Sequence, residues 1–275
     1  MSTTRRTLLV GATSLSAVAA VPLSTTQASR AEPVRAVKRY EGFSAPVGMA
    51  FDAAGNLYVA EWSAGRVSRI AADGTRKAFA TGLEGPAGLA IGPDGAIYVG
   101  SYARDEIYHF TPEGQRSVFV EGLATPAGIG FDRSGRLLIA NRRTNQVLAV
   151  TADRRLVPVI SDLQTPVGVV QKADGGYVVA NIAGGITIVR ADGSRVEAGQ
   201  GFRAPGAGIV QTSGGRVFVA DYGGTTVREI LMSGSSQAVA DGFSSPVGLV
   251  LTPDQTALLT ATWGDGSIYQ IDVPQ

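Results

Sequence analysis

Near-copies of one segment of about forty residues make up most of the chain, and this repeat constrains its fold more than any other feature. The first full copy, residues 42–80, reads GFSAPVGMAFDAAGNLYVAEWSAGRVSRIAADGTRKAFA. A Pro-x-Gly or close relative marks each copy, and its glycine returns every forty residues, at Gly48, Gly88, Gly128, Gly168, Gly208 and Gly248. Self-similarity at such a period indicates a propeller or a solenoid.

Each repeat has the sequence pattern of four short strands. In the first copy these are PVGMAF, NLYVA, RVSRI and RKAFA, which are rich in β-branched and aromatic residues and are bounded by turn sequences such as Asp73-Gly74. Four strands in about forty residues is the size of one propeller blade. No window shows the amphipathic stripe of a ten-residue helix, which disfavours helical repeats.

The two ends of the repeat region predict how the ring closes. The last repeat stops after a third strand at residues 267–271, and a strand sequence without a partner, VRAVKRY, precedes the first repeat at residues 34–40. We expect this segment to complete the last blade, because closure hides the edges that an open array would expose. The predicted fold is therefore an all-β, six-bladed β-propeller with four-stranded blades, forming one domain over residues 32–275.

Residues 1–31 resemble a twin-arginine export signal. Arg5-Arg6 precedes an apolar run, residues 8–21, and small residues suited to a signal peptidase follow near Ala28 and Ala31. The run is too short, and too rich in Ala, Ser and Gly, for a permanent transmembrane helix. The prediction is an exported protein, periplasmic or extracellular, without a stable membrane anchor; the alternative is a disordered basic leader.

Composition excludes several classes of site. The chain has no cysteine, so disulfides, Cys catalysis and Cys metal sites are absent. Its formal charge is +1, or −2 without residues 1–31, which gives no general attraction for nucleic acid. The single histidine, His109, falls inside a predicted strand, which argues against a His dyad, a three-His zinc site and a Ser-His-Asp triad.

An oxygen-bearing residue ends the second strand of every repeat. The six are Glu61, Ser101, Asn141, Asn181, Asp221 and Thr262. Carboxylate and amide oxygens suit a hard cation such as Ca²⁺ or Mg²⁺, so Glu61, Asn141, Asn181 and Asp221 are candidate metal ligands. The alternative is structural, because such side chains at strand ends often bond the backbone of the following turn. Candidate acids or bases are Glu61, Glu84 and Asp221, each of which could equally be a solvated carboxylate.

The next residue in each repeat forms a second set, which is mostly aromatic. The six are Trp62, Tyr102, Arg142, Ile182, Tyr222 and Trp263. Aromatic residues at a loop mouth could stack on a sugar, an aromatic ligand or a peptide, which makes Trp62, Tyr102, Arg142, Tyr222 and Trp263 candidate ligand-binding residues. The alternative is packing between blades. Four arginines near this face could hold a carboxylate or be isolated surface charges: Arg66, Arg104, Arg142 and Arg143.

The repeat pattern PxGhxxxxxGxhYVA resembles the NHL-repeat and gluconolactonase/regucalcin-like propellers over residues 34–273. That resemblance implies a divalent cation in the channel mouth, held in part by a Glu in a GEGP-like segment, which Glu84-Gly85-Pro86 resembles. The other implied ligands lie in PNG and PDG segments, whereas the middle residue of each Pro-x-Gly here is Val or Ala. The segment GPDGAIY at residues 92–98 resembles the streptogramin lyase propellers, whose histidines this chain lacks.

These patterns lead to three functional hypotheses. The first is an exported propeller, non-catalytic or weakly catalytic, that binds a small molecule or a protein segment on its aromatic loop face. The second is a divalent-metal-dependent hydrolase of lactone or ester type, with a Ca²⁺-like ion at the oxygen-bearing set. The third is a streptogramin-like lyase.

Overall fold

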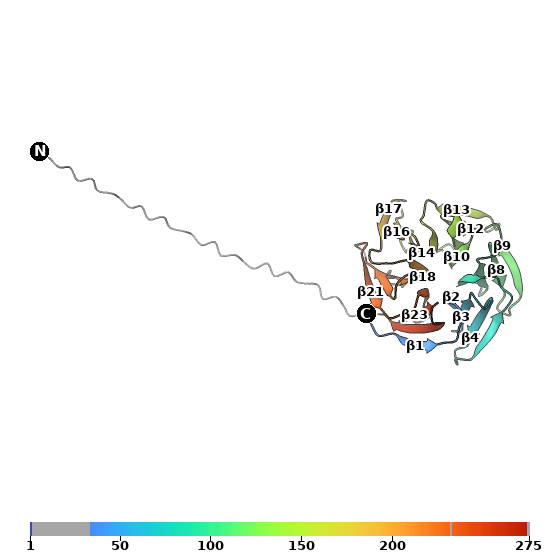
Figure 1. Cartoon of the computed structure of the whole chain (residues 1–275). Helices are drawn as coiled ribbons and strands as arrows, with labels where there is room; N and C mark the ends of the chain where they lie inside the picture. The colour runs from blue at the N-terminus through green and yellow to red at the C-terminus, as the bar shows by residue number, and fades with distance from the viewer. Residues whose placement is uncertain (2–33, 232, 274–275) are drawn as a thin grey trace. The chain divides into compact units, whose positions relative to one another are not determined.

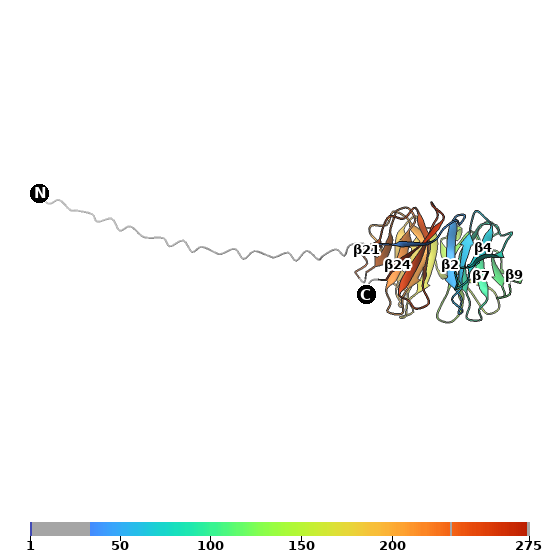
Figure 2. The same ribbon diagram turned by 90° about the horizontal axis from the view of Figure 1, so that it is seen from below.

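Six antiparallel sheets of four strands surround a common axis and form the predicted six-bladed propeller (Figure 1). The computed structural model describes residues 1, 34–231 and 233–273. The predicted signal peptide, apart from Met1, lies outside these residues. Viewed from the side, the strands run through the thickness of the ring (Figure 2). Among the described residues, no helix is long and apolar enough to span a bilayer.

Blades one to three each consist of four consecutive strands. Blade one contains β2 (Pro46–Phe51), β3 (Leu57–Glu61), β4 (Arg66–Ile70) and β5 (Arg76–Ala80). Blade two contains β6 (Pro86–Ile91), β7 (Ile97–Ser101), β8 (Glu106–Phe110) and β9 (Arg116–Val120). Blade three contains β10 (Pro126–Phe131), β11 (Leu137–Asn141), the short 3-10 helix η1 (Arg142–Thr144), β12 (Gln146–Val150) and β13 (Leu156–Ile160).

Blades four and five repeat this order, and blade six takes its outer strand from the start of the ring. Blade four contains β14 (Pro166–Gln171), β15 (Tyr177–Asn181), β16 (Gly185–Val189) and β17 (Arg195–Ala198). Blade five contains β18 (Pro205–Gln211), β19 (Val217–Asp221), β20 (Val227–Ile230) and β21 (Ser236–Ala240). Blade six contains β22 (Pro246–Leu251), β23 (Ala257–Thr262), β24 (Ser267–Asp272) and β1 (Val37–Tyr40).

The predicted closure is confirmed, with one change in its bounds. Strand β1 pairs antiparallel with β24, and Val37 lies opposite Gln270. The strand begins at Val37 instead of Val34, because the Val34 amide donates a hydrogen bond to the carbonyl of Val239 in blade five, at 2.7 Å. The residues before Val37 therefore leave the ladder of blade six.

The core lies between blades rather than inside any one of them. Six clusters of buried apolar side chains are found, and each joins neighbouring blades. Between blades one and two, for example, Val67 packs with Val99 and Phe110. At the closing seam, Leu57 of blade one packs with Ile268 of blade six. Because a blade alone leaves these faces exposed, the ring is the smallest unit that buries them.

The repeated glycine marks where the first strands of neighbouring blades meet near the axis. A Cβ atom at Gly128 would lie 2.5 Å from the carbonyl oxygen of Val167 in the next blade, which is closer than any real contact. The equivalent glycines face the neighbouring backbone in the same way, including Gly248, whose Cβ would overlap the carbonyl of Val47 across the closing seam. Glycine therefore recurs every forty residues because no other side chain fits between the first strands of neighbouring blades.

Candidate functional site

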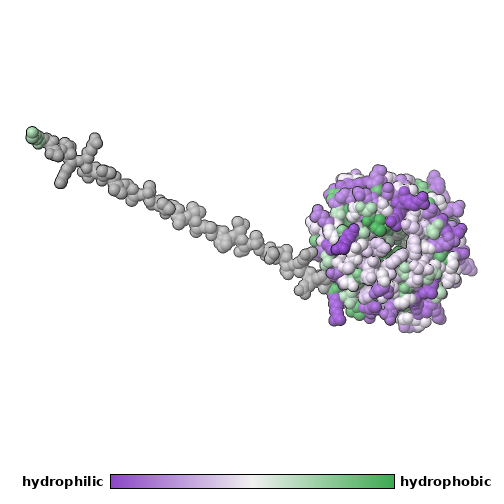
Figure 3. All heavy atoms as spheres, in the orientation of Figure 1, coloured by the Kyte–Doolittle hydropathy of each residue, from purple (hydrophilic) through white to green (hydrophobic). Residues whose placement is uncertain are grey.

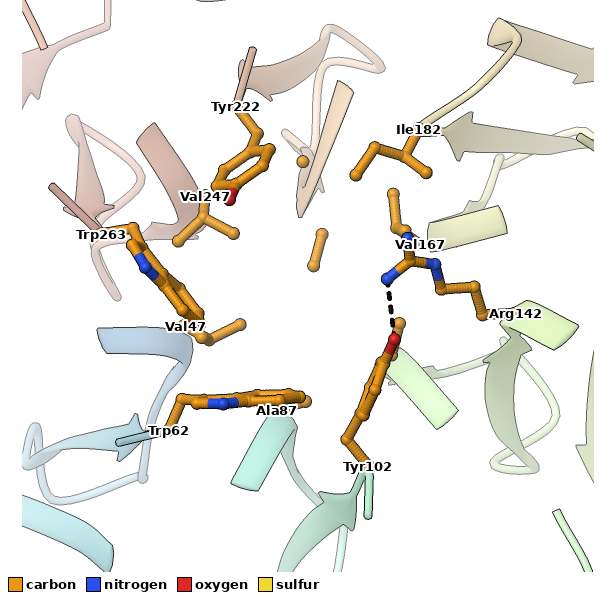
Figure 4. A pocket seen from close by; sticks show the side chains of 13 residues that line it. Val47, Trp62, Ala87, Tyr102, Arg142, Val167, Ile182, Tyr222, Val247 and Trp263 are labelled. Carbon is orange, nitrogen blue, oxygen red and sulfur yellow. Dashed lines mark hydrogen bonds between the residues drawn. The ribbon is translucent and has the colours of Figure 1, made fainter. Parts of the chain in front are cut away.

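A cavity of about 250 Å³ opens at the centre of the ring, on the face that carries the loops after the second strands. Figure 3 shows a hollow near the middle of the ring, and Figure 4 shows the side chains around the cavity. All five predicted ligand-binding residues line it, together with Ile182 of blade four: Trp62, Tyr102, Arg142, Tyr222 and Trp263. The structure therefore brings this set together.

Four aromatic side chains form a continuous half-ring along one side of the cavity (Figure 4). The ring centroids of Trp62 and Tyr102 are 4.6 Å apart, and those of Trp62 and Trp263 are 5.8 Å apart. Tyr222 meets Trp263 edge-on, at 6.5 Å and 82°. Contacts of this kind hold the rings in defined orientations. All four side chains are half-buried, so part of each remains accessible from the cavity.

These four aromatics lie outside the buried clusters at the seams between blades. None of them is a member of the buried clusters at the six seams, whereas Tyr58, Tyr98 and Tyr108 are. The four rings nevertheless touch across blades, because Trp62 of blade one contacts Tyr102 of blade two and Trp263 of blade six. Ligand binding and packing between blades both stay predictions for this set.

Of the described residues that line the cavity, Arg142 has the one charged side chain. It begins η1 in blade three, and its Nη1 donates a hydrogen bond to the hydroxyl oxygen of Tyr102, at 2.9 Å. Its guanidinium also lies 5.9 Å from the centre of the Tyr102 ring. Within residues 34–231 and 233–273, no carboxylate forms an ion pair with it.

The part of the cavity nearest the axis is apolar. It is lined by the middle residues of the Pro-x-Gly segments and by Gly206, and the residues are Val47, Ala87, Ala127, Val167, Gly206, Ala207 and Val247. Sequence reasoning noted that these side chains cannot ligate a metal but did not assign them to the wall of a site. One feature of the sequence could have indicated this wall: apart from Gly206, each of these residues is small or branched and stands next to the repeated glycine at which the first strands meet.

Backbone hydrogen bonds position the cavity residues. The Trp62 amide donates to the carbonyl of Ala45, and the amide of Arg142 donates to that of Thr125. Ala45 has φ +52° and Thr125 has φ +58°, the left-handed conformation that side chains other than glycine rarely adopt. The equivalent residues of three other blades share this conformation: Gly85, Thr165 and Ser245. A strained residue therefore recurs at the mouth of the cavity, where the surrounding structure must hold it.

The oxygen-bearing set supplies part of that support. Asn141 accepts a hydrogen bond from the Ala124 amide at 2.8 Å, and Asn181 accepts one from the Gln164 amide at 3.3 Å. Asp221 accepts from the amides of Arg203 and Ala204, both at 3.0 Å. Each side chain is thus bonded to the loop end that precedes the first strand of its own blade. The contacts are of the structural kind, but they reach the loop before the first strand and not the following turn that the alternative interpretation expects.

Ser101 and Thr262 complete the set with their hydroxyl groups as donors. Ser101 donates to the carbonyl of Glu84, at 2.7 Å, while Thr262 bonds the carboxylate of Asp265 and the carbonyl of Ser267, the latter at 2.9 Å. All six members are buried and none lines the cavity.

Glu61 is the most heavily bonded member. It accepts hydrogen bonds from Arg66 at 2.7 Å, from the Ser68 hydroxyl at 2.5 Å and from the Ser44 amide at 2.9 Å. Burial would raise the pKa of Glu61, but the bonds from Arg66, Ser68 and Ser44 outweigh it and hold the pKa below its usual value. Glu61 is therefore an ionised anchor of its loop.

The other candidate acids and bases also lie outside the cavity lining. The side chain of Glu84 is 58% exposed and pairs with Arg104 at 3.1 Å. Asp221 is buried against the loop of blade five. His109 lies on β8, where its ring contacts Tyr98 at 5.2 Å. The assignment of acid or base chemistry to Glu61, Glu84 and Asp221 stays a prediction.

The predicted metal ligands are not gathered into an acidic cluster. In the part of the chain that the structure describes, no group of three or more His, Cys, Asp or Glu side chains has the arrangement of a metal site. Glu61, Asn141, Asn181 and Asp221 come from four blades, and the oxygens named above already accept hydrogen bonds from the protein. A Ca²⁺ or Mg²⁺ site formed by these four residues stays a prediction.

Comparisons with known proteins agree with the fold. The sequence model of the virginiamycin B lyase family matches residues 24–269. No curated protein sequence matches the chain. Among solved structures, the chain is similar to the catalytically inactive histidine-to-alanine variant of virginiamycin B lyase from Staphylococcus aureus with quinupristin. The two share 16% identity, with a TM-score of 0.67 and coverage of 84% of this chain and 81% of that one.

Two further structures are comparable. A streptogramin B lyase shares 16% identity, with a TM-score of 0.66 and coverage of 88% of this chain and 97% of that one. A gluconolactonase from Xanthomonas campestris shares 18% identity, with a TM-score of 0.78 and coverage of 90% and 92%. At these identities the likeness shows the propeller fold alone.

Proposed function

The chain belongs to the virginiamycin B lyase family, and we propose that it is an exported propeller that binds a small molecule or a protein segment in its central cavity. In this proposal the protein is non-catalytic or weakly catalytic. Export rests on the twin-arginine pattern of residues 1–31, which lies outside the described residues.

The observation that carries the proposal is the half-ring of aromatics around an apolar wall. The chain has two tryptophans, and both line this cavity although neither belongs to the buried clusters at the seams between blades. Aromatic surface that stays accessible around an apolar cavity is typical of a binding site. The cavity is slightly smaller than most sites for drug-sized molecules, which hold roughly 300–1,000 Å³. It would suit a body of one or two rings, with any larger part projecting into solvent.

Tryptophan emission gives a direct test, because every tryptophan of the chain lies at the proposed site. Benzyl alcohol, a neutral aromatic probe, would be titrated into two variants that each keep one reporter, Trp62→Phe and Trp263→Phe. We expect a saturable change with the same dissociation constant in both. Tyr177→Phe, outside the cavity, is the control and should behave like the parent. A change that rises linearly, as it does with free tryptophan, would refute the proposal.

A second candidate is the divalent-metal-dependent hydrolase of lactone or ester type. The fold shared with a gluconolactonase favours it, and the hydrogen bonds that occupy the oxygen-bearing set weigh against it. The test is calorimetric titration of Ca²⁺ into the chelator-treated chain, residues 32–275. If this function holds, one ion binds per chain and the double variant Asn181→Ala, Asp221→Ala abolishes binding. Unchanged affinity in the double variant would exclude these ligands.

The family itself suggests a lyase as a third candidate. Among the described residues that line the cavity, the polar side-chain groups are the phenols of Tyr102 and Tyr222, the two indoles and the guanidinium of Arg142. Any proton transfer at the cavity surface would have to use one of these groups or a group of the ligand. The single histidine of the chain, His109, does not line the cavity.

A further inference from the structure

Resting on the proposed binding function, we infer that the ligand of the central cavity is an aromatic monocarboxylate. Its ring would lie against the half-ring of Trp62, Tyr222 and Trp263, and its carboxylate would bind Arg142. The inference names the chemical class that the cavity selects.

The first argument is the unmatched charge of Arg142. Several other arginines of the ring are paired: Arg66 with Glu61, Arg104 with Glu84 and Glu106, Arg136 with Asp132, and Arg216 with Glu229. Arg142 is half-buried and bonds a neutral phenol, and no described carboxylate pairs with it. Partial burial of a cation without an anion is unfavourable, so an incoming anion would gain the interaction that the protein leaves unmade.

The second argument is the donor geometry. A guanidinium presents five N–H donors in a planar fork that matches the two oxygens of a carboxylate. The bond to Tyr102 engages one of them and fixes the side chain, as the dashed line in Figure 4 shows. Because the side chain is already held before the ligand arrives, less conformational entropy is lost on binding.

The third argument is the position of the charge relative to the aromatic surface. Arg142 comes from blade three, whereas Tyr222, Trp263 and Trp62 come from blades five, six and one. Figure 4 shows the guanidinium on the opposite side of the cavity from these rings. A ligand that uses both must therefore carry an aromatic body at one end and an anionic group at the other.

The surrounding chemistry limits the class further. With one cation at the cavity and aliphatic residues along its inner wall, a single negative charge can be matched and a second cannot. An amine in place of the carboxylate would meet the like charge of Arg142. The cavity thus discriminates among ligands of the same shape by the sign of their charge.

Three one-ring probes of similar size and different charge test this inference: benzoate, benzyl alcohol and benzylamine. Each is titrated into residues 32–275 at constant ionic strength, with tryptophan emission as the readout. We expect benzoate to bind about tenfold or more tighter than benzyl alcohol, as a charge-assisted hydrogen bond would give. Benzylamine should bind more weakly than benzyl alcohol. Added salt should reduce the advantage of benzoate.

The variant Arg142→Gln should weaken the binding of benzoate by about tenfold and the binding of benzyl alcohol by much less, so the advantage of benzoate is lost. Saturable binding of benzyl alcohol to the variant would show that the cavity still folds. Arg142→Lys should restore part of it. The matched control is Arg143→Gln, the neighbouring exposed arginine, which should keep the full advantage.

The outcomes separate this inference from the proposed function. If benzyl alcohol binds but benzoate binds no tighter, or if Arg142→Gln retains the preference, the aromatic monocarboxylate is wrong while the cavity remains a binding site. If none of the probes gives a saturable change, the proposed function itself is wrong.

Discussion

Two adjacent residues at the end of each second strand have different tasks, and the site depends on that division. In blade three, Asn141 is buried and holds the Ala124 amide, while Arg142 faces the cavity. In blade one, Glu61 is buried and holds the Ser44 amide, while Trp62 faces the cavity. The first residue of each pair ends the strand and the second begins the turn or 3-10 helix that follows, so one position can anchor the loop and the next can meet the ligand.

Replacing Asn141 with alanine tests the anchoring role. The change leaves the Ala124 amide without its acceptor and the Thr144 hydroxyl without its donor. An unmet buried polar group costs about 1–3 kcal/mol, so we expect the free energy of unfolding in urea to fall by that amount. Asn141→Asp keeps an acceptor oxygen and should lose less. Equal stability of parent and alanine variant would show that the bond contributes nothing.

Glu61 gives a prediction about pH. Because its pKa is lowered in the folded state, the stabilisation is complete above its ordinary unfolded value, about 4.3, and is lost as pH falls through the folded value. Glu61→Gln should therefore lower the free energy of unfolding by about 1–3 kcal/mol near neutral pH. In acid, the difference between parent and variant should shrink. The other acidic groups are common to both proteins, so a difference that stays constant down to about pH 3 would contradict the assignment.

Among the elements, the first strands of the blades carry the tightest requirement of the fold. They lie nearest the axis, and each Pro-x-Gly glycine faces the backbone of the next blade. The sequence predicts this repeat and its strands well, because period-two patterns and turn residues are local signals. It predicts the ends of β1 less well, since the Val34 amide bonds to Val239, a partner distant in the chain.

Two glycines of one strand provide a matched comparison on β10. In Gly128→Ala the new methyl group would meet the Val167 carbonyl at 2.5 Å, whereas in Gly130→Ala the nearest atom would be 3.8 Å away. We expect Gly128→Ala to destabilise the ring by about 3 kcal/mol or more and Gly130→Ala by less than about 1 kcal/mol. Thermal and urea unfolding would measure both. Similar losses for the two variants would mean that close approach is not the reason for the repeat.

For the whole molecule, closure and the central cavity have one origin, because six blades in a ring bring their loop ends to one axis. The period of forty identifies equivalent residues, which is why Trp62, Tyr102, Arg142, Tyr222 and Trp263 could be predicted as a set. It does not give side-chain directions. The sequence therefore could not decide whether Asn141 or Asn181 faces a cation or a loop amide, nor show that Val47 and Ala87 line the wall.

Deleting residues 34–40 tests the ring as a unit. The deletion removes β1 and exposes the edge of β24, so we expect the free energy of unfolding to fall by roughly 2–4 kcal/mol, about 1 kcal/mol for each ladder hydrogen bond lost. Val37→Thr, at a residue that is 55% exposed, is the control and should change stability by no more than about 0.5 kcal/mol. A deletion variant that melts like the parent would contradict closure by this strand.

The most direct test of the account is a tryptophan-emission titration of residues 32–275 with benzoate, performed first with a chelator and then with added Ca²⁺. The account predicts one saturable transition with the same dissociation constant in both, because the aromatic half-ring and Arg142 form the site while the oxygen-bearing residues hold the loops. No saturable change under either condition would contradict the account. Binding only with Ca²⁺ would also contradict it and would move the function to the predicted metal ligands Glu61, Asn141, Asn181 and Asp221.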